Sequence, residues 1–203
     1  LLQLAPLGVV GFHPAALPSN RGRHPLIWAL ILGLTETASS FFFMDQGADS
    51  GDILSQVPVP ISKSDDAASL YDRVTEIAME QIRTLHLNLA TGTYQRQPQD
   101  RATANIWRKR SFLDGQIDWR MAASSIHNLV RGLSRPYVGA HFLWQGQKVL
   151  LWKTEIVEGI PNNLESGKVV QVDEDGPVVK AGMDAIRFRE YVPKISLSAG
   201  DYL

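Results

Sequence analysis

One histidine and one aspartate, His13 and Asp49, are the residues of this chain best suited to moving a proton. His13 follows the apolar run 9–12, and Asp49 lies in the loop DQGADSGD, which comes directly after the apolar stretch ASSFFFM. Imidazole exchanges protons near neutral pH, and a carboxylate beside it stabilises the protonated ring and fixes its tautomer. Each residue also has a structural alternative, since histidines in loops often pack and aspartates in glycine-rich loops often accept hydrogen bonds within turns.

The other familiar signatures of chemistry fail when they are tested against the sequence. The chain has no glycine-rich phosphate loop, no dinucleotide fingerprint, no Gly-x-Ser-x-Gly elbow and no histidines at metal-ligand spacing. A calcium loop starting at Asp45 fails because Gly47 stands where an oxygen ligand is needed and Ser50 stands where glycine is needed. We therefore predict no metal site.

Composition and charge set broader limits. The 203 residues are 44% hydrophobic and 20% charged, with a net charge of -1, which is typical of a soluble globular protein and offers no overall attraction for nucleic acid or an anionic membrane. The absence of cysteine excludes disulfides and a cysteine nucleophile, and it favours a reducing cytoplasmic location. Prolines and glycines interrupt the uncharged first twenty residues, so we predict neither a signal peptide nor a transmembrane helix.

The first half of the chain predicts the alternating strands and helices of an α/β domain. Residues 9–12 and 38–44 are short apolar runs that predict buried strands, and residues 25–33 between them predict a helix that begins at a proline and ends at a glycine. Residues 64–92 predict a long amphipathic helix with a polar N-cap and a terminal glycine. In an open α/β sheet, loops at the carboxyl ends of strands meet over one crevice, so we expect His13 and Asp49 to be neighbours.

The second half of the chain has a different sequence pattern. Residues 93–138 are polar and irregular and predict a linker that contains a short helix over 122–133. From residue 139 the pattern alternates between apolar and polar residues around Gln-Gly and Asp-Gly turns, which predicts successive hairpins. We therefore expect three parts, namely an α/β part over 1–92, the linker over 93–138, and a small antiparallel β-rich, barrel-like domain over 139–203.

The segments around His13 and Asp49 resemble the signature of the 10-formyltetrahydrofolate-dependent formyltransferases. That family has a histidine-containing turn leading into Leu-Pro and Arg-Gly, then an Asp-x-Gly-x-Asp-x-Gly loop, as in FHPAALPSNRG and DQGADSGDIL here. Three later segments resemble the family's linker and the start of its C-terminal β domain, namely DGQIDW, IHNLVRGL and GAHFLWQGQKVLLWKTEIV. The resemblance implies a partial doubly wound, Rossmann-like domain over 1–92 that lacks its N-terminal part, so we expect this chain alone not to turn over substrate.

The resemblance also implies a reaction and a set of roles. In this family a primary amine attacks the formyl carbon of 10-formyltetrahydrofolate, and the tetrahedral intermediate expels tetrahydrofolate. His13 would then be the proton shuttle and oxyanion partner, and Asp49 would be the carboxylate that orients it. The backbone of Gly47 and Ala48 would line the pterin pocket, where glycine permits close approach.

The sequence departs from the family at Gly11, two residues before the histidine. The family usually has asparagine there, and its amide donates a hydrogen bond to the formyl oxygen. The loss of one oxyanion donor can cost on the order of a hundred- to a thousand-fold in rate. We expect a water, a backbone amide, Asn20 or His24 to substitute.

The distribution of charge favours one acceptor of the formyl group over another. Residues 101–136 contain seven Lys and Arg against two Asp and Glu, whereas residues from 140 onward contain seven against nine. Because phosphate neutralisation supplies much of the affinity for RNA, the slightly acidic C-terminal part favours a nucleotide-linked amino sugar, with the basic linker as an aid to its two phosphates. Methionyl-tRNA is the alternative acceptor, and a non-catalytic binding remnant of the fold is the second alternative.

Overall fold

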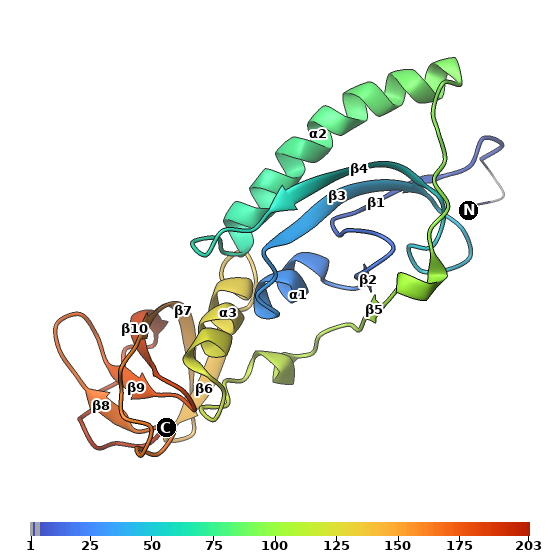
Figure 1. The fold of residues 1–203 in the computed structure, drawn as a ribbon. Coiled ribbons are helices and arrows are strands. Elements are labelled where there is room, and N and C mark those ends of the chain that lie inside the picture. Colours follow the sequence, from blue (N-terminus) through green and yellow to red (C-terminus); the bar gives the residue numbers. More distant parts are fainter. Residues whose placement is uncertain (1, 3–4) are drawn as a thin grey trace. The chain divides into compact units, whose positions relative to one another are not determined.

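The computed structural model describes residues 2 and 5–203, which form two compact units (Figure 1). Unit 1 contains the chain up to Ala29 together with Leu34–Asp65 and Ser69–Arg110; unit 2 contains Leu30–Gly33, Asp66–Ala68 and Ser111–Leu203. Within the described residues, no helix has the length and apolar character needed to cross a membrane.

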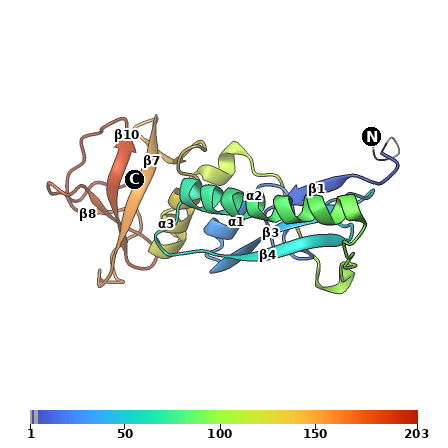
Figure 2. The same ribbon diagram turned by 90° about the horizontal axis from the view of Figure 1, so that it is seen from above.

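Unit 1 is built on a three-stranded sheet with the strand order β1-β3-β4, antiparallel throughout. Its elements in chain order are β1 (Val10–His13), β2 (Arg21–Gly22), α1 (Pro25–Ile31), β3 (Glu36–Phe43), β4 (Ile53–Pro60), α2 (Ala67–Thr91), the short 3-10 helix η2 (Arg101–Thr103) and β5 (Ile106–Trp107). The helix α2 lies along one face of this sheet (Figures 1 and 2). The strands β2 and β5 form a separate parallel pair of two residues each.

Hydrogen bonds attach both faces of the sheet to the segments that cover them. On the α2 side, Gln81 Nε2 donates to the carbonyl oxygen of Ser39 and to Ser55 Oγ, at 3.2 and 2.9 Å. Successive strand residues point to opposite faces, and the neighbouring Ser40 Oγ donates to the carbonyl oxygen of Ala15 at 2.6 Å. The segment that follows β1 is therefore held against the face opposite α2.

The helix α2 begins at a side-chain cap and ends at a glycine. Asp66 Oδ1 accepts a hydrogen bond from the backbone N–H of Ala68, which is one of the N–H groups that the first turn leaves without a helical partner. Leu70 and Val74 are buried one turn apart on the face toward the sheet. Gly92 adopts a φ of 69°, the left-handed conformation that ends helices.

Unit 2 is a five-stranded antiparallel sheet with one helix packed on it. The strand order is β6-β7-β10-β9-β8, and α3 contacts β7 and β10. Its elements are the 3-10 helix η3 (Phe112–Gly115), α3 (Ala123–Gly132), β6 (Ala140–Trp144), β7 (Gln147–Val157), β8 (Val169–Gln171), β9 (Val178–Lys180) and β10 (Ala185–Val192). A mixed α/β unit followed by a sheet-rich unit confirms the fold class expected from the sequence.

The core of unit 2 is aromatic and also contains a buried lysine. The Trp119 ring lies 5.5 Å from that of Phe142 and 5.9 Å from that of Phe188, measured between centroids. Lys180 is fully buried, and its Nζ donates to the carbonyl oxygens of Ala181, Gly182 and Asp184 at 2.7, 3.4 and 3.3 Å. Backbone carbonyls therefore satisfy this cation, because a buried ammonium group without partners would be costly.

Candidate active site

The structure places His13 and Asp49 side by side. His13 ends β1 and is 5% exposed, and its Nδ1 lies 3.6 Å from Asp49 Oδ2. This distance is longer than a hydrogen bond but close enough for strong interaction between an imidazolium and a carboxylate. Their roles in catalysis stay predictions.

The second ring nitrogen of His13 is already engaged. His13 Nε2 lies 2.8 Å from the carbonyl oxygen of Asn20, and since a carbonyl can only accept, Nε2 is the donor. Asn20 has a φ of 65°, an uncommon conformation that asparagine tolerates better than most residues. The hydrogen bond fixes the ring and leaves Nδ1, the nitrogen beside Asp49, as the one that can exchange a proton.

Asp49 is oriented by the segment that follows His13. Its φ is 52°, and its Oδ2 accepts a hydrogen bond of 2.8 Å from the backbone N–H of Gly22. Gly22 itself adopts a φ of 100°, and a Cβ added there would lie 2.3 Å from the carbonyl oxygen of Trp107. Only glycine can therefore present this N–H to Asp49 while pairing with β5.

Two further polar residues, Arg21 and Gln99, hold the Asp49 loop in place. Gln99 Nε2 donates to the carbonyl oxygens of Asp49 and Gly51 at 2.9 and 2.6 Å. Gln99 Oε1 accepts from Nε and Nη2 of the buried Arg21 at 3.1 and 2.6 Å. Sequence reasoning missed both residues: Arg21 stood within the Arg-Gly motif without an assigned role, and Gln99 gave no signal.

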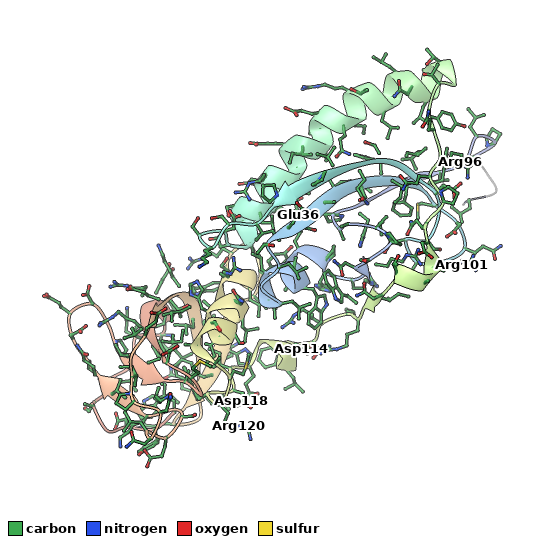
Figure 3. All side chains as sticks on the ribbon, viewed as in Figure 1. Glu36, Arg96, Arg101, Asp114, Asp118 and Arg120 are labelled. Atoms are coloured by element: carbon green, nitrogen blue, oxygen red, sulfur yellow. The ribbon has the colours of Figure 1, made fainter. Side chains whose placement is uncertain are left out.

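The far end of the loop is attached to the chain that leaves α2. Arg96, labelled in Figure 3, donates from Nε to Asp52 Oδ2 at 2.9 Å, and its guanidinium carbon lies 4.5 Å from the centre of the Phe43 ring. Backbone hydrogen bonds from Phe43 to Asp52 and from Met44 to Val9, at 2.9 and 2.7 Å, close the base of the loop.

His13 and Asp49 meet by a route different from the one expected. β1 and β3 are antiparallel, with Val10 opposite Phe43 and His13 opposite Ser40, so their carboxyl ends do not lie together. The expectation taken from open sheets with aligned strands is wrong for these two strands. Asp49 instead reaches His13 because its loop is held to the segment 20–22 by the contacts described above.

Gly47 and Ala48 lie at the exposed tip of the same loop. The Gly47 N–H donates to Asp45 Oδ1 at 2.9 Å, and Ser50 Oγ donates to the same oxygen at 2.6 Å. A Cβ on Gly47 would overlap Ser50 Oγ, so a larger residue there would require the Ser50 side chain to move. Exposure of these two residues fits a role in contacting a bound ligand.

The space beside Gly11 is filled by aromatic and thioether side chains. Gly11 lies opposite Phe42 on β3, and a Cβ added to it would come 2.9 Å from Phe42 Cζ and 3.0 Å from Met44 Cγ. Phe42 is buried. An asparagine at position 11 would therefore require Phe42 to move.

His24, one of the residues expected to substitute for that asparagine, lies in a positive environment. Its φ is 58°, and partial burial lowers the pKa of its imidazole, with further lowering from the charges of Arg110, Arg23 and Lys109. At neutral pH the ring is therefore uncharged. Among the described residues, no group of three or more His, Asp or Glu side chains could hold a metal ion.

Comparisons with known families and proteins identify relatives of this chain. The family model "Formyl transferase" matches residues 1–84, and "Formyl transferase, C-terminal domain" matches residues 112–203. The methionyl-tRNA formyltransferase of Acetivibrio thermocellus is 32% identical over 190 residues, which are 94% of this chain and 61% of that protein. This chain therefore spans about three fifths of the length of that relative.

Solved structures share the fold at low sequence identity. The N-formyltransferase from Helicobacter canadensis, in complex with folinic acid and dTDP-3-aminofucose, matches with a TM-score of 0.70 at 18% identity, over 89% of this chain and 65% of that one. HypX from Aquifex aeolicus, in complex with tetrahydrofolic acid, matches with a TM-score of 0.68 at 19% identity, over 88% of this chain and 31% of that one. Both have the same fold as the two units described above.

Proposed function

This chain belongs to the formyltransferase family, and from that premise we propose that it transfers a formyl group from 10-formyltetrahydrofolate to a primary amine. The observation that carries the proposal is the buried contact between His13 Nδ1 and Asp49 Oδ2 at 3.6 Å. The two solved relatives contain folinic acid or tetrahydrofolic acid, which supports a folate donor. The cysteine-free sequence supports our expectation that the reaction occurs in a reducing cytoplasm.

The chain's own residues would handle the proton. The bound folate supplies the formyl carbon that the amine attacks. His13 Nδ1 would accept the proton that the amine loses and return it to the folate nitrogen as the bond from that nitrogen to the formyl carbon breaks, while Asp49 stabilises the transient imidazolium across 3.6 Å. The carbonyl oxygen of Asn20 accepts a hydrogen bond from Nε2 and so keeps the ring from rotating, and burial of His13 limits exchange of the proton with water.

We place the pterin of the donor against the loop tip formed by Gly47 and Ala48. Both residues are exposed, and the loop's internal hydrogen bonds to Asp45 hold the tip in shape before any ligand arrives. The tip is therefore preorganised, which reduces the entropy lost on binding. This exposed and preformed tip supports our proposal that the loop binds the pterin.

The oxyanion donor that asparagine would supply at position 11 must come from elsewhere. Gly11 has no side chain, and Phe42 and Met44 occupy the adjoining space. We propose that a water or a backbone amide donates to the oxyanion, with Asn20 and His24 as the side chains that could do so. Uncharged His24 can donate from one ring nitrogen.

For the acceptor we propose the amino group of a nucleotide-linked amino sugar. The basic residues 101–136 and the slightly acidic residues from 140 onward support a small phosphorylated acceptor. Methionyl-tRNA is the alternative, which the name of the relative from Acetivibrio thermocellus favours. A non-catalytic binding remnant of the fold is the second alternative, which the filled space at Gly11 favours.

One experiment separates these functions. The full-length protein is incubated with 10-formyltetrahydrofolate and either a dTDP-linked amino sugar or methionyl-tRNA, while release of tetrahydrofolate is followed. We expect release with the amino sugar and none with the tRNA. The opposite pattern would establish the tRNA alternative, and release with neither acceptor would contradict formyl transfer and favour the binding remnant.

A further inference from the structure

Cationic and aromatic side chains gather around Trp28 in unit 1. The guanidinium carbons of Arg110 and Arg108 lie 4.7 and 5.4 Å from the centre of the Trp28 ring, and the Trp107 ring lies 6.5 Å from it. Trp28 Nε1 donates to the carbonyl oxygen of Arg108 at 3.0 Å. We define the Trp28 cluster as these residues together with two further cations and the uncharged ring of His24, so that its members are Arg23, His24, Trp28, Trp107, Arg108, Lys109 and Arg110.

The two parts of this cluster come from segments far apart in the sequence. Parallel pairing of β2 with β5 places Gly22 opposite Trp107, and the N–H of Arg23 donates to the Trp107 carbonyl oxygen at 3.1 Å. The backbone N–H of Trp28 donates to the carbonyl oxygen of His24 at 3.0 Å. These backbone contacts therefore hold together the two segments that carry the charged side chains.

The cluster concentrates positive charge on the surface. Arg23, Arg108 and Lys109 are exposed, and Arg110 is partly exposed. Within the part of the chain that the structure describes, neither Arg23 nor Lys109 forms an ion pair with a carboxylate. Like charges held together in this way repel one another and attract an anion.

The same segment connects the cluster to the candidate active site. Asn20 accepts the hydrogen bond from His13, the Gly22 N–H bonds Asp49, and Arg23 and His24 follow directly. Arg23 and His24 of the cluster therefore lie one and two residues after Gly22, whose N–H orients Asp49.

We propose that the Trp28 cluster binds a diphosphate, and that this diphosphate belongs to the amine acceptor. Guanidinium groups match phosphate oxygens in a two-pronged geometry, and contact with an aromatic face restricts their motion before binding. The identity of the ligand as the acceptor rests on the proposed function, whereas diphosphate binding by the cluster does not. The sequence predicted only that the basic segment aids phosphates; the structure adds Arg23, His24 and the two tryptophans.

A small diphosphate suits the cluster better than RNA. Its charges come from Arg23 and the short segment 108–110, whereas RNA presents a phosphate on every nucleotide and therefore binds best to an extended basic surface. The residues from 140 onward carry more acidic than basic side chains and would extend such a surface poorly. RNA binding is accordingly an outcome that the test below must exclude.

The test titrates the full chain with inorganic pyrophosphate, with dTDP and with tRNA by calorimetry. We expect dTDP and pyrophosphate to bind, and Arg110→Ala and Lys109→Ala each to weaken binding by about 10-fold or more, as expected when a charged hydrogen bond is lost. The matched control is Arg135→Ala, since Arg135 lies 4.4 Å from the Trp152 ring but is paired with Glu190 at 2.7 Å. We expect that control to change dTDP binding less than 2-fold.

A second readout does not depend on calorimetry. Because neighbouring cations help to lower the pKa of His24, a bound diphosphate should offset their field and raise that pKa, which an NMR titration of the His24 ring measures. Lys109→Ala changes an exposed side chain, so it tests the proposal even where Arg110→Ala perturbs folding.

The outcomes divide as follows. The proposal is overturned if neither dTDP nor pyrophosphate binds, or if both variants bind them as tightly as the unchanged protein does. It is also overturned if tRNA alone binds and Arg110→Ala abolishes that binding. Diphosphate binding without formyl transfer to a dTDP-linked amino sugar contradicts the proposed function and leaves the site standing. If Arg110→Ala and Lys109→Ala both transfer the formyl group with an unchanged KM for the dTDP-linked amino sugar, the bound diphosphate does not belong to the acceptor.

Discussion

The two units bury polar side chains in different ways. In unit 1, buried His13 faces the carboxylate of Asp49, and buried Arg21 bonds the amide of Gln99, all on loops or very short strands. In unit 2, buried Lys180 at the end of strand β9 donates to three backbone carbonyls, and the rings of His141 and Phe112 stack with their centroids 4.3 Å apart. The pair of His13 and Asp49 is therefore a candidate for chemistry, whereas Lys180, which is satisfied by backbone carbonyls, supports the fold.

The histidines sharpen this contrast. Burial is the main cause that lowers the pKa of both His127 and His141 in unit 2, with additional lowering by Arg131 and Lys148 respectively. Both rings are thus kept neutral, as suits residues that pack. His13 alone among these three has a carboxylate beside a ring nitrogen, with Asp49 Oδ2 3.6 Å from its Nδ1.

Replacing the proton-carrying histidine should have the largest effect. We expect His13→Asn to lower kcat/KM for formyl transfer by about 10²- to 10⁴-fold in the full-length protein, because the general base is lost. His127→Gln, which changes a histidine bonded to Thr154 at 3.0 Å in unit 2, should change it less than 3-fold by the same assay of tetrahydrofolate release. Equal losses in the two variants would remove the distinction between the units.

Adding a methyl group at Gly22 should damage unit 1 as a structure. The Cβ would lie 2.3 Å from the Trp107 carbonyl at a φ of 100°, so we expect Gly22→Ala to lower the free energy of unfolding by about 3 kcal/mol. Gly92→Ala is the control, since Gly92 has a φ of 69° but no atom within 4 Å of the added Cβ, and should cost about 1 kcal/mol. Urea denaturation measures both values.

Replacing the buried lysine of unit 2 should reduce stability without touching the chemistry. Lys180→Met leaves three carbonyl oxygens without their donor, and we expect a loss of about 2 to 3 kcal/mol in urea denaturation. The kcat per folded molecule should stay within 2-fold of the unchanged protein. A selective loss of kcat would show that unit 2 contributes more than support.

The family's asparagine should not fit at position 11 in this chain. Gly11→Asn places an atom 2.9 Å from Phe42 Cζ, and we expect it to cost about 2 kcal/mol by overpacking. Phe42→Leu removes the ring atoms, so the double variant should be more stable than the sum of the single changes predicts. Strict additivity in this double-mutant cycle would contradict the steric explanation.

A pH experiment should show the smallest difference between the units. The hydrogen bond from Arg73 lowers the pKa of buried Asp65 to about 2. The hydrogen bond from Arg120 likewise lowers the pKa of Asp118 to about 2, and Figure 3 labels these last two residues. A depressed carboxyl pKa stabilises the folded state above about pH 4, and this stabilisation disappears as the pH falls toward 2. Asp65→Asn should therefore cost about 1 to 2 kcal/mol at pH 7 and little at pH 2.

Asp118→Asn is the matched control for that experiment. The side chains of Asp118 and Arg120 are 45% and 85% exposed, so solvent screens their interaction. We expect no measurable change in the midpoint of urea denaturation at either pH. A loss at pH 7 equal to that of Asp65→Asn would show that burial does not determine the strength of these pairs.

The sequence predicted some features of the site because they are local. Glycine-rich turns and the histidine motif pointed to His13 and Asp49, and the terminal glycine indicated the end of α2 at residue 91. Strand direction was not predictable, since a short apolar run such as 9–12 reads the same in parallel and antiparallel sheets.

Tertiary contacts account for what the sequence could not show. Gln99 lies in a polar segment without periodicity, and its role depends on that segment returning to the loop of Asp49. β2 and β5 contain two residues each, which is too short for any pattern. The crowding of Gly11 by Phe42 likewise depends on the register between β1 and β3.

The position of Gly22 has a consequence for engineering this chain toward other acceptors. Its N–H holds Asp49 while its α-carbon lies against the Trp107 carbonyl, so the backbone cannot be redesigned on one side without disturbing the other. Libraries that insert or delete residues near 106–110 would mostly yield inactive clones. Diversity is better introduced at the exposed side chains of Arg23 and Lys109, which can change while this backbone junction is kept.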